Sequence, residues 1–209
     1  MDKCETQKIN ICGCDYSIPA YYEHIEALPD DPKGAEPFAV ATPNAQCFFI
    51  GYEIPKEQMM PVDQLVLLAG IRQFLGGNQG IIECEVKGNC AYSIVKTLDE
   101  HSGVQYTLTF QEIVDGQVIF LQGSFEEAGT TGIRDAVVFE LLRQNNQLGT
   151  EDNPLEGWVR DPYDESVTTG ALMNASELRE FDSEFPGTAL MVCRELVDHL
   201  VSSSDNRGR

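Results

Sequence analysis

The middle of the chain shows an alternation of apolar and polar residues that predicts an antiparallel β-sheet. Between residues 104 and 111 the apolar residues are Val104, Tyr106, Leu108 and Phe110, and the polar residues between them are Gln105, Thr107, Thr109 and Gln111. A period of two places one set on a buried face and the other on a wetter face. Asp115-Gly116 follows, before the apolar run 118–121. Asp-Gly fits the type I′ turn that joins paired strands, so we expect a β-hairpin here.

Other apolar runs predict further strands. They lie at residues 9–18, 38–40, 47–54, 81–86 and 91–98. The first run ends at Pro19, and an acidic, proline-marked loop follows it. Proline cannot donate a hydrogen bond to a strand ladder, so residues 28–34 are predicted to form a loop.

Three segments have the spacing of amphipathic helices. The first begins near Pro61 and Asp63 and is expected to end at Gly76-Gly77, where glycine favours a left-handed stop. The second spans residues 132–144 and could be capped by Thr130 or Thr131. The third spans residues 188–201 and carries a broad apolar stripe that must pack on something, whereas residues 202–209 are expected to fray.

This order of elements predicts an α+β fold, in which an antiparallel meander sheet is covered by helices. We expect residues 1–145 to form the core. Residues 146–209 are expected to form a linker and a C-terminal helical extension that packs on the core.

Three stretches of the chain resemble the PsbP-like superfamily. Cys14-Asp15-Tyr16-Ser17-Ile18-Pro19-Ala20-Tyr21-Tyr22 is similar to its opening strand, proline and aromatic pair. Pro61-Val62-Asp63-Gln64-Leu65 resembles the start of its first helix. Residues 104–142 resemble its closing hairpin and final helix. The match covers roughly residues 9–145 and implies a bacterial member of the superfamily with a C-terminal extension.

The resemblance implies a binding protein. The superfamily includes an extrinsic subunit of photosystem II, a eukaryotic factor that binds the GTPase Ran, and bacterial chaperones for secreted effectors. These proteins share no catalytic triad, and none of their functional residues maps onto this chain.

Charge and composition exclude several classes of partner. The chain has 209 residues, with 14 Lys and Arg against 34 Asp and Glu, for a net charge of −20. A nucleic-acid backbone or an anionic membrane would require a positive surface. No apolar run is long enough to span a membrane. The N-terminus lacks an apolar signal core, and the cysteine count of seven is odd, so we expect reduced thiols and a cytoplasmic location.

The sequence contains no motif that identifies catalytic, cofactor or metal chemistry. Phosphate-binding glycine loops, nucleophile elbows and zinc-protease motifs are absent from it. The cysteines lack the paired spacing of a zinc site. We therefore expect no cofactor, no metal and no enzymatic activity. The alternative is a small hydrolase with an unrecognised pair of carboxylates.

Trp158 and Tyr163 are the candidate binding residues. They lie in a polar, acidic segment where large aromatic residues are unexpected unless they dock. They could fasten the extension to the sheet, or they could form the edge of a groove for a partner, because aromatic residues are favoured at binding hot spots.

The sequence favours a non-catalytic protein-binding module: an adaptor, an effector chaperone or an immunity-type protein. Its acidic surface suits a protein partner with a basic surface. A structural homo-oligomer is a further alternative, because the apolar stripe of the last helix could form a homodimer seam.

Overall fold

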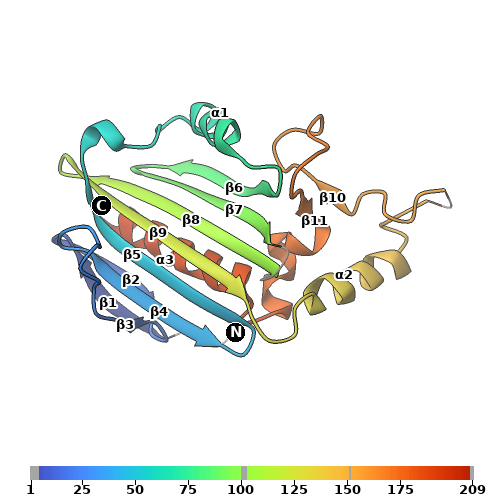
Figure 1. The fold of residues 1–209 in the computed structure, drawn as a ribbon, viewed down its shortest axis with the longest axis horizontal. Coiled ribbons are helices and arrows are strands. Elements are labelled where there is room, and N and C mark those ends of the chain that lie inside the picture. Colours follow the sequence, from blue (N-terminus) through green and yellow to red (C-terminus); the bar gives the residue numbers. More distant parts are fainter. Residues whose placement is uncertain (1–4, 100–102, 151, 208–209) are drawn as a thin grey trace.

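The main sheet is antiparallel and has seven strands in the order β3-β4-β5-β9-β8-β7-β6 (Figure 1). The computed structural model describes residues 5–99, 103–150 and 152–207. The strands are β3 (Glu23–His24), β4 (Glu36–Thr42), β5 (Ala45–Ile54), β6 (Gln79–Lys87), β7 (Cys90–Asp99), β8 (Gly103–Val114) and β9 (Gln117–Glu127). Together with the helices, this sheet confirms the predicted α+β class.

The predicted hairpin joins β8 to β9. Asp115 and Gly116 have φ angles of 49° and 84°, the left-handed values that a type I′ turn requires. Tyr106, Leu108 and Phe110 are buried on one face, as the alternation predicts. Local turn chemistry and the period of two are therefore sufficient to define this part of the sheet.

One face of the sheet is covered by helix α3 (Ala189–Arg207) and an N-terminal hairpin of β1 (Thr6–Ile11) and β2 (Cys14–Pro19). The single strand predicted over residues 9–18 is wrong, because the chain reverses at Cys12-Gly13. These residues have φ angles of 49° and 88°, and the Gly13 N–H donates to the side-chain oxygen of Asn10 at 3.0 Å. A cysteine in the left-handed region gives no turn signal in the sequence.

Helix α3 runs further than the sequence predicts. The expected fraying after residue 201 is wrong up to Arg207, because tertiary contacts hold the last turns. The Ser17 N–H donates to the Ser203 hydroxyl at 2.9 Å, and the Arg207 guanidinium lies 4.4 Å from the centroid of the Tyr16 ring. The apolar stripe of α3 is buried in the core of its own chain, so its side chains do not form an exposed dimer seam.

Among the described residues, the other face of the sheet is covered mainly at its β6–β7 end, by helix α1 (Gln64–Phe74), which follows the short helix η1 (Lys56–Gln58). The Asp63 carboxylate caps α1 by accepting from the Val66 N–H at 3.0 Å. The left-handed stop predicted at residues 76–77 is wrong. The helix ends at Phe74, and Leu75 then turns the chain with an extended conformation (φ −66°, ψ 131°).

Helix α2 (Ile133–Gln144) lies beyond one end of the sheet (Figure 1). It begins after Gly132, whose φ is 76°, and no side chain caps it, so the predicted threonine cap is wrong. Its contacts are mainly with η2 (Ala175–Glu177), where Asn174 and the Ser176 hydroxyl donate to the Asp135 carboxylate. The remaining short elements are β10 (Val159–Arg160), β11 (Met173–Asn174) and η3 (Arg179–Glu184).

The division of the chain into a core up to residue 145 and an extension after it stays a prediction. Side chains from both parts belong to one hydrophobic cluster. None of the helices in the described ranges has the length and apolar character needed to cross a bilayer.

Candidate functional site

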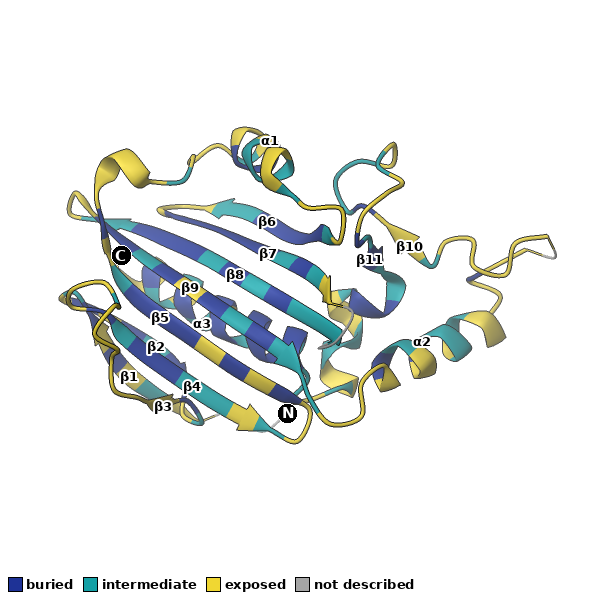
Figure 2. Ribbon diagram, viewed as in Figure 1, coloured by how far each residue is buried: buried dark blue, intermediate teal, exposed yellow. Residues whose placement is uncertain are grey.

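The sheet face opposite α3 is largely uncovered, and we call it the open face. Figure 1 looks directly at it, with α3 behind the strands, and Figure 2 shows its many half-buried and exposed residues. Its outward side chains on β8 and β9 include Thr107, Thr109, Gln122 and Ser124, none of which is buried. The middle of this seven-stranded sheet is therefore accessible on the open face.

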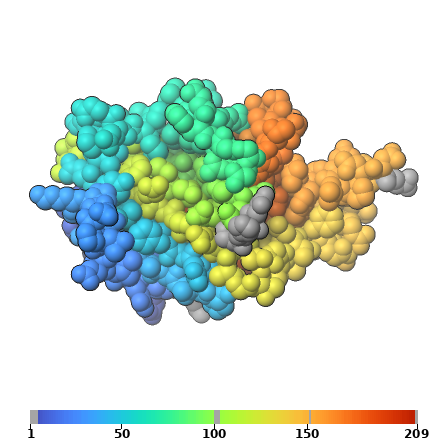
Figure 3. All heavy atoms as spheres, in the orientation of Figure 1, coloured from blue at the N-terminus to red at the C-terminus, as the bar shows by residue number. Residues whose placement is uncertain are grey.

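A groove of about 440 Å³ runs between α1 and the open face. Leu67, Gly70 and Phe74 line it from the helix. Val95 of β7 and Thr107 of β8 line it from the sheet. In the space-filling view the surface is hollowed beside α1 (Figure 3). The groove is therefore apolar on its helix side and mixed on its floor.

Helix α1 leaves an unusual amount of apolar surface exposed. Leu67 and Leu68 face the sheet and pack against Ile81. Phe74, by contrast, is 86% exposed and Leu65 is 76% exposed. Single exposed apolar residues are normal, but several on one short helix beside a groove are typical of an interaction surface.

Gly70 marks an empty place in this groove. A Cβ atom built on Gly70 meets no heavy atom within 4 Å, although the residue sits in the middle of α1. Glycine lowers helix stability relative to alanine by about 1 kcal/mol. Packing therefore does not require this glycine, and the space above it is available to another molecule.

The linker before α1 is fastened to the open face. The Gln111 side chain accepts from the Met60 N–H at 2.6 Å and donates to the Met60 carbonyl at 2.8 Å. Gln111 is fully buried, unlike Thr107 and Thr109 on the same face of β8, because the linker lies over it. The two bonds set where the groove begins.

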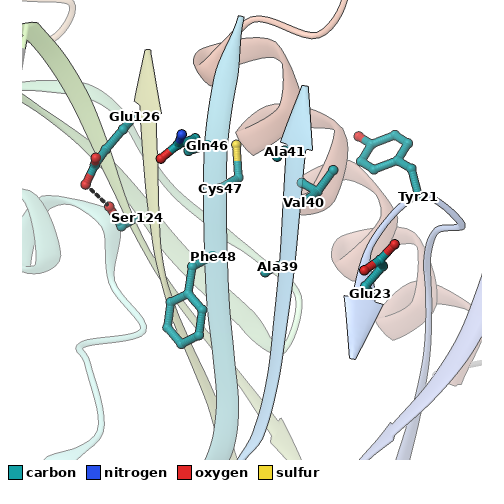
Figure 4. A pocket seen from close by; sticks show the side chains of 10 residues that line it. All are labelled: Tyr21, Glu23, Ala39, Val40, Ala41, Gln46, Cys47, Phe48, Ser124 and Glu126. Atoms are coloured by element: carbon teal, nitrogen blue, oxygen red, sulfur yellow. Dashed lines mark hydrogen bonds between the residues drawn. The ribbon is translucent and has the colours of Figure 1, made fainter. Parts of the chain in front are cut away.

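A second hollow, of about 590 Å³, lies at the far side of the open face (Figure 4). Its lining includes the small side chains Ala39 and Ala41, the ring of Phe48, and the carboxylates of Glu23 and Glu126. Glu126 accepts from the Ser124 hydroxyl at 3.3 Å and from the Gln105 amide at 3.1 Å. These bonds hold one carboxylate in place on the sheet surface.

Strand register connects the groove with this hollow. Val95 pairs with Thr107, Thr107 with Ser124, Ser124 with Phe48, Phe48 with Ala39, and Ala39 with Glu23. Directly paired residues of antiparallel strands carry their side chains on the same face. These six residues therefore form one line across the open face, which we call the cross-strand row.

Neither aromatic residue predicted to bind lies on the uncovered part of the open face, because Tyr163 packs with α1 and Ile81 at the β6 end. The Tyr163 hydroxyl accepts from the Cys84 N–H of edge strand β6 at 2.6 Å, and burial raises the pKa of Tyr163 to about 12. The Trp158 ring meets Phe139 of α2 edge-on, with 5.1 Å between centroids. Neither residue lines the groove or the second hollow. A role for them in binding stays a prediction.

Tyr163 and its neighbours block the edge of β6. The Ala171 N–H donates to the Gln79 carbonyl at 3.1 Å, and Gly80 lies so close to the Ala171 carbonyl that a Cβ there would be 2.0 Å from its oxygen. The segment is held further by Arg72, whose guanidinium pairs with Asp161 at 2.6 Å. Unpaired strand edges invite aggregation, and this cover prevents it.

The covered face contains a buried ion-pair network that sequence reasoning missed. Glu83 of β6 pairs with Arg194 of α3 at 2.6 Å and with Arg179 at 2.8 Å. Burial raises the pKa of Glu83, but the two guanidinium groups outweigh burial and hold the pKa below its ordinary value. Asp182 then links Arg194 to Arg134 of α2.

A second buried pair lies next to this network. The Lys96 ammonium of β7 lies 3.0 Å from Glu177, and the Tyr106 hydroxyl donates to the same carboxylate at 2.7 Å. The signal available in the sequence was a charged residue inside an apolar run, as at Glu83, Lys96 and Arg194. These three residues lie far from their partners in the sequence, so the pairing depends on the tertiary fold.

Asp198 and Ser202, two polar residues of α3, already have hydrogen-bond partners. A hollow of about 330 Å³ on α3 gathers Asp198, His199 and Ser202. The Asp198 carboxylate accepts from Arg179, however, and the Ser202 hydroxyl donates to the Asp198 carbonyl at 2.7 Å. These bonds are not those of a nucleophile and its base.

The six described cysteines are free thiols, and Cys4 lies outside the described residues. Burial raises the pKa of Cys47 to about 12 and that of Cys84 to about 11. Thiols with such values are protonated at neutral pH and are poor nucleophiles and metal ligands. Within the described ranges, no cluster of three or more His, Cys, Asp or Glu could hold a metal ion.

Comparison with known proteins gives partial likenesses. No protein-family model matches the chain. An ATP phosphoribosyltransferase of Parasynechococcus marenigrum (strain WH8102) is 30% identical over 132 residues, which are 57% of this chain and 58% of the enzyme. The chain therefore spans less than two thirds of the length of this curated relative.

Two solved structures have a similar arrangement of elements. The Ran-binding protein Mog1p of Saccharomyces cerevisiae matches with a TM-score of 0.44 and 8% identity, over 97% of this chain and 98% of Mog1p. Protein PA94 of Pseudomonas aeruginosa, of unknown function, matches with a TM-score of 0.35 and 10% identity, over 70% of this chain and 96% of PA94. At these scores the likenesses do not establish a family, so PsbP-like membership stays a prediction.

Proposed function

We propose that this protein is a non-catalytic protein-binding module that holds a basic partner on its open face. The observation that carries the proposal is the apolar groove along α1, with Phe74 exposed beside an uncovered sheet. Burial of exposed apolar surface against a partner is favourable, so apolar side chains exposed beside a groove favour binding there. An effector chaperone or an adaptor fits this groove, because each holds a segment of another protein.

The charge of the molecule supports a basic partner. The chain carries a net charge of −20. Six of its arginines are already paired with carboxylates of the same chain: Arg72, Arg134, Arg143, Arg179, Arg194 and Arg207. Cations held in such pairs offer little positive field to an approaching molecule, so the surface favours a partner of opposite charge.

The likeness to ATP phosphoribosyltransferase does not lead us to propose that activity. An enzyme that binds phosphorylated substrates needs cationic or backbone donors aimed into its site. Neither the groove nor the second hollow has a lysine or arginine among its described lining residues. The free thiols support the reducing, cytoplasmic location that we infer for this binding role.

Two substitutions at Gly70 test the proposal. Gly70→Trp fills the groove, whereas Gly70→Ala adds one methyl group into open space and serves as the matched control. We expect the wild-type chain and the Gly70→Ala variant to retain the same protein from native cell extract, at low ionic strength more strongly than at physiological ionic strength. The Gly70→Trp variant should not retain it, although its circular dichroism and melting temperature are preserved.

The captured protein is then purified and titrated against the same three chains by calorimetry. Equal affinity for all three would exclude the groove as the docking site. A second copy of the same chain as the only captured species would replace the proposal with self-association.

A further inference from the structure

The second hollow has the character of a site for a basic side chain. Glu23 and Glu126 lie on its walls, and both belong to the open face, because Glu23 pairs with Ala39 and Glu126 pairs with Gln46 in the strand register. No lysine or arginine is among the described residues that line it. The two carboxylates lie three strands apart, on β3 and β9, and Glu126 is bonded to Ser124 and Gln105. A cation above Ala39 would therefore meet the carboxylate of Glu23, which no lysine or arginine of the described lining neutralises.

The floor of the hollow suits the apolar stem of such a side chain. Ala39 and Ala41 leave room above β4, and the ring of Phe48 lies beside them (Figure 4). Lysine and arginine pack their methylene stems on apolar surface while their charged ends reach polar groups. An aromatic ring beside a cation adds a favourable interaction. Aromatic floor, small residues and carboxylate walls together favour a long basic side chain over a small ion.

The cross-strand row places this hollow at a defined distance from the groove along α1. Thr107 lines the groove on β8, and Ala39 lines the hollow on β4, with β9 and β5 between them. Three strand spacings of about 4.8 Å separate the two positions by roughly 15 Å. An extended chain covers that distance in about four or five residues.

We propose that the partner segment crosses the open face along this row, with an apolar residue in the groove and a lysine or arginine in the hollow. The proposal rests on the function proposed above and adds the chemistry and spacing of the segment. The charged end group is held by Glu23, which pairs with Ala39 at the end of the row, and the apolar residue packs against Leu67, Gly70 and Phe74. The occupant is therefore a basic, amphipathic stretch of protein. Its two anchor residues are about four or five residues apart.

The test uses a random peptide library displayed on phage and selected on the immobilised full chain. We expect the enriched peptides to share an apolar residue and a lysine or arginine at about that spacing. A selected peptide is then synthesised with the basic residue as arginine and as citrulline, which keeps the shape and removes the charge. The arginine peptide should bind the wild-type chain about five- to tenfold more tightly.

Three variants separate the inference from the proposed function. Glu23→Gln should remove the preference for arginine over citrulline. Glu156→Gln changes the net charge equally at an exposed position elsewhere and should leave the preference intact. Gly70→Trp should weaken the binding of both peptides.

Each contrary result has a distinct meaning. Enriched peptides without a basic residue at that spacing, or an equal loss in both glutamine variants, would overturn the inference while the groove remains a docking site. Peptides that bind the wild-type chain and the Gly70→Trp variant equally would overturn the proposed function as well.

Discussion

The two faces of the central sheet differ in how they are completed. The covered face is closed by α3, whose Leu196 is fully buried, and by ion pairs that join Glu83 to Arg194. The open face carries polar side chains, a groove and a helix that exposes Phe74. Both faces are built on the same strands, so strand propensity does not explain the difference. The described residues cover one face fully and the other mainly at its β6–β7 end, which is why we propose the rest of that face as a docking surface.

The largest effect should come from removing the cover of the closed face. Deletion of residues 187–209 exposes the buried side chains of β5, β8 and β9, and we expect the remaining chain not to fold. Circular dichroism and the dispersion of amide signals in an NMR spectrum measure this. A folded, soluble fragment would show instead that the core is independent of α3.

Single alanine substitutions sharpen the same contrast. Leu196→Ala removes a fully buried side chain and should lower the free energy of unfolding by about 2–5 kcal/mol. Leu65→Ala removes a side chain that is 76% exposed and should change that free energy by less than about 0.5 kcal/mol. Denaturant titration measures both. Equal losses would mean that α1 is not exposed as the structure shows.

The ion pairs of the covered face should matter next. Glu83→Ala leaves Arg194 buried without its carboxylate, which should cost about 3–5 kcal/mol of folding free energy. Glu83→Gln keeps an acceptor and serves as the matched control, with a smaller loss. If Glu83→Gln unfolds at the same denaturant concentration as the wild-type chain, the charge of Glu83 is not what holds α3.

The same carboxylate predicts how stability depends on pH. The pKa of Glu83 is lower in the folded chain than in the unfolded chain, where glutamate titrates near about 4.3. Its contribution is therefore present above that value and is lost as pH falls through the lower, folded pKa. The wild-type chain should lose stability below about pH 4.3 more steeply than Glu83→Gln does. Parallel pH profiles would contradict this assignment.

A smaller effect is expected at the edge of the sheet. Tyr163→Phe removes the acceptor for the Cys84 N–H and should cost about 1–2 kcal/mol, because that donor is left without its partner. Light scattering on heating would report whether the uncovered β6 edge also associates. A loss in stability without association would mean that the hydrogen bond stabilises the fold but is not needed to block the β6 edge.

Gly70→Ala should have the smallest effect on stability, and it should stabilise the chain where the other variants destabilise it. The added methyl group meets no neighbour, and alanine is the better helix former by about 1 kcal/mol. The melting temperature should therefore rise slightly. A fall would show that the groove beside α1 is narrower than the structure indicates.

Local patterns predicted the fold where sequence determines structure over a few residues. The alternation at residues 104–111 and the Asp115-Gly116 turn are examples. The reversal at Cys12 and the last turns of α3 were missed, because they depend on Asn10 and on contacts of Arg207 with distant residues.

The candidate site was predictable only in part. The sequence indicates a polar second face on β8, since Thr107 and Thr109 alternate with buried residues. It does not indicate that α1 would cover mainly the β6–β7 end. Nor does it indicate that Glu23, Ala39 and Thr107 would align through four strand pairings. Such alignments arise from register between strands that are far apart in the chain.

Hydrogen exchange with and without the captured partner tests the central claim most directly. If the open face is the docking surface, partner binding should slow the exchange of amides in residues 60–75. Exchange should also slow in the parts of β4 and β5 that line the second hollow. Exchange in α3 should be unchanged, because its apolar side is already buried within the chain. Slowing confined to α3 or α2, with residues 60–75 unaffected, would contradict the account.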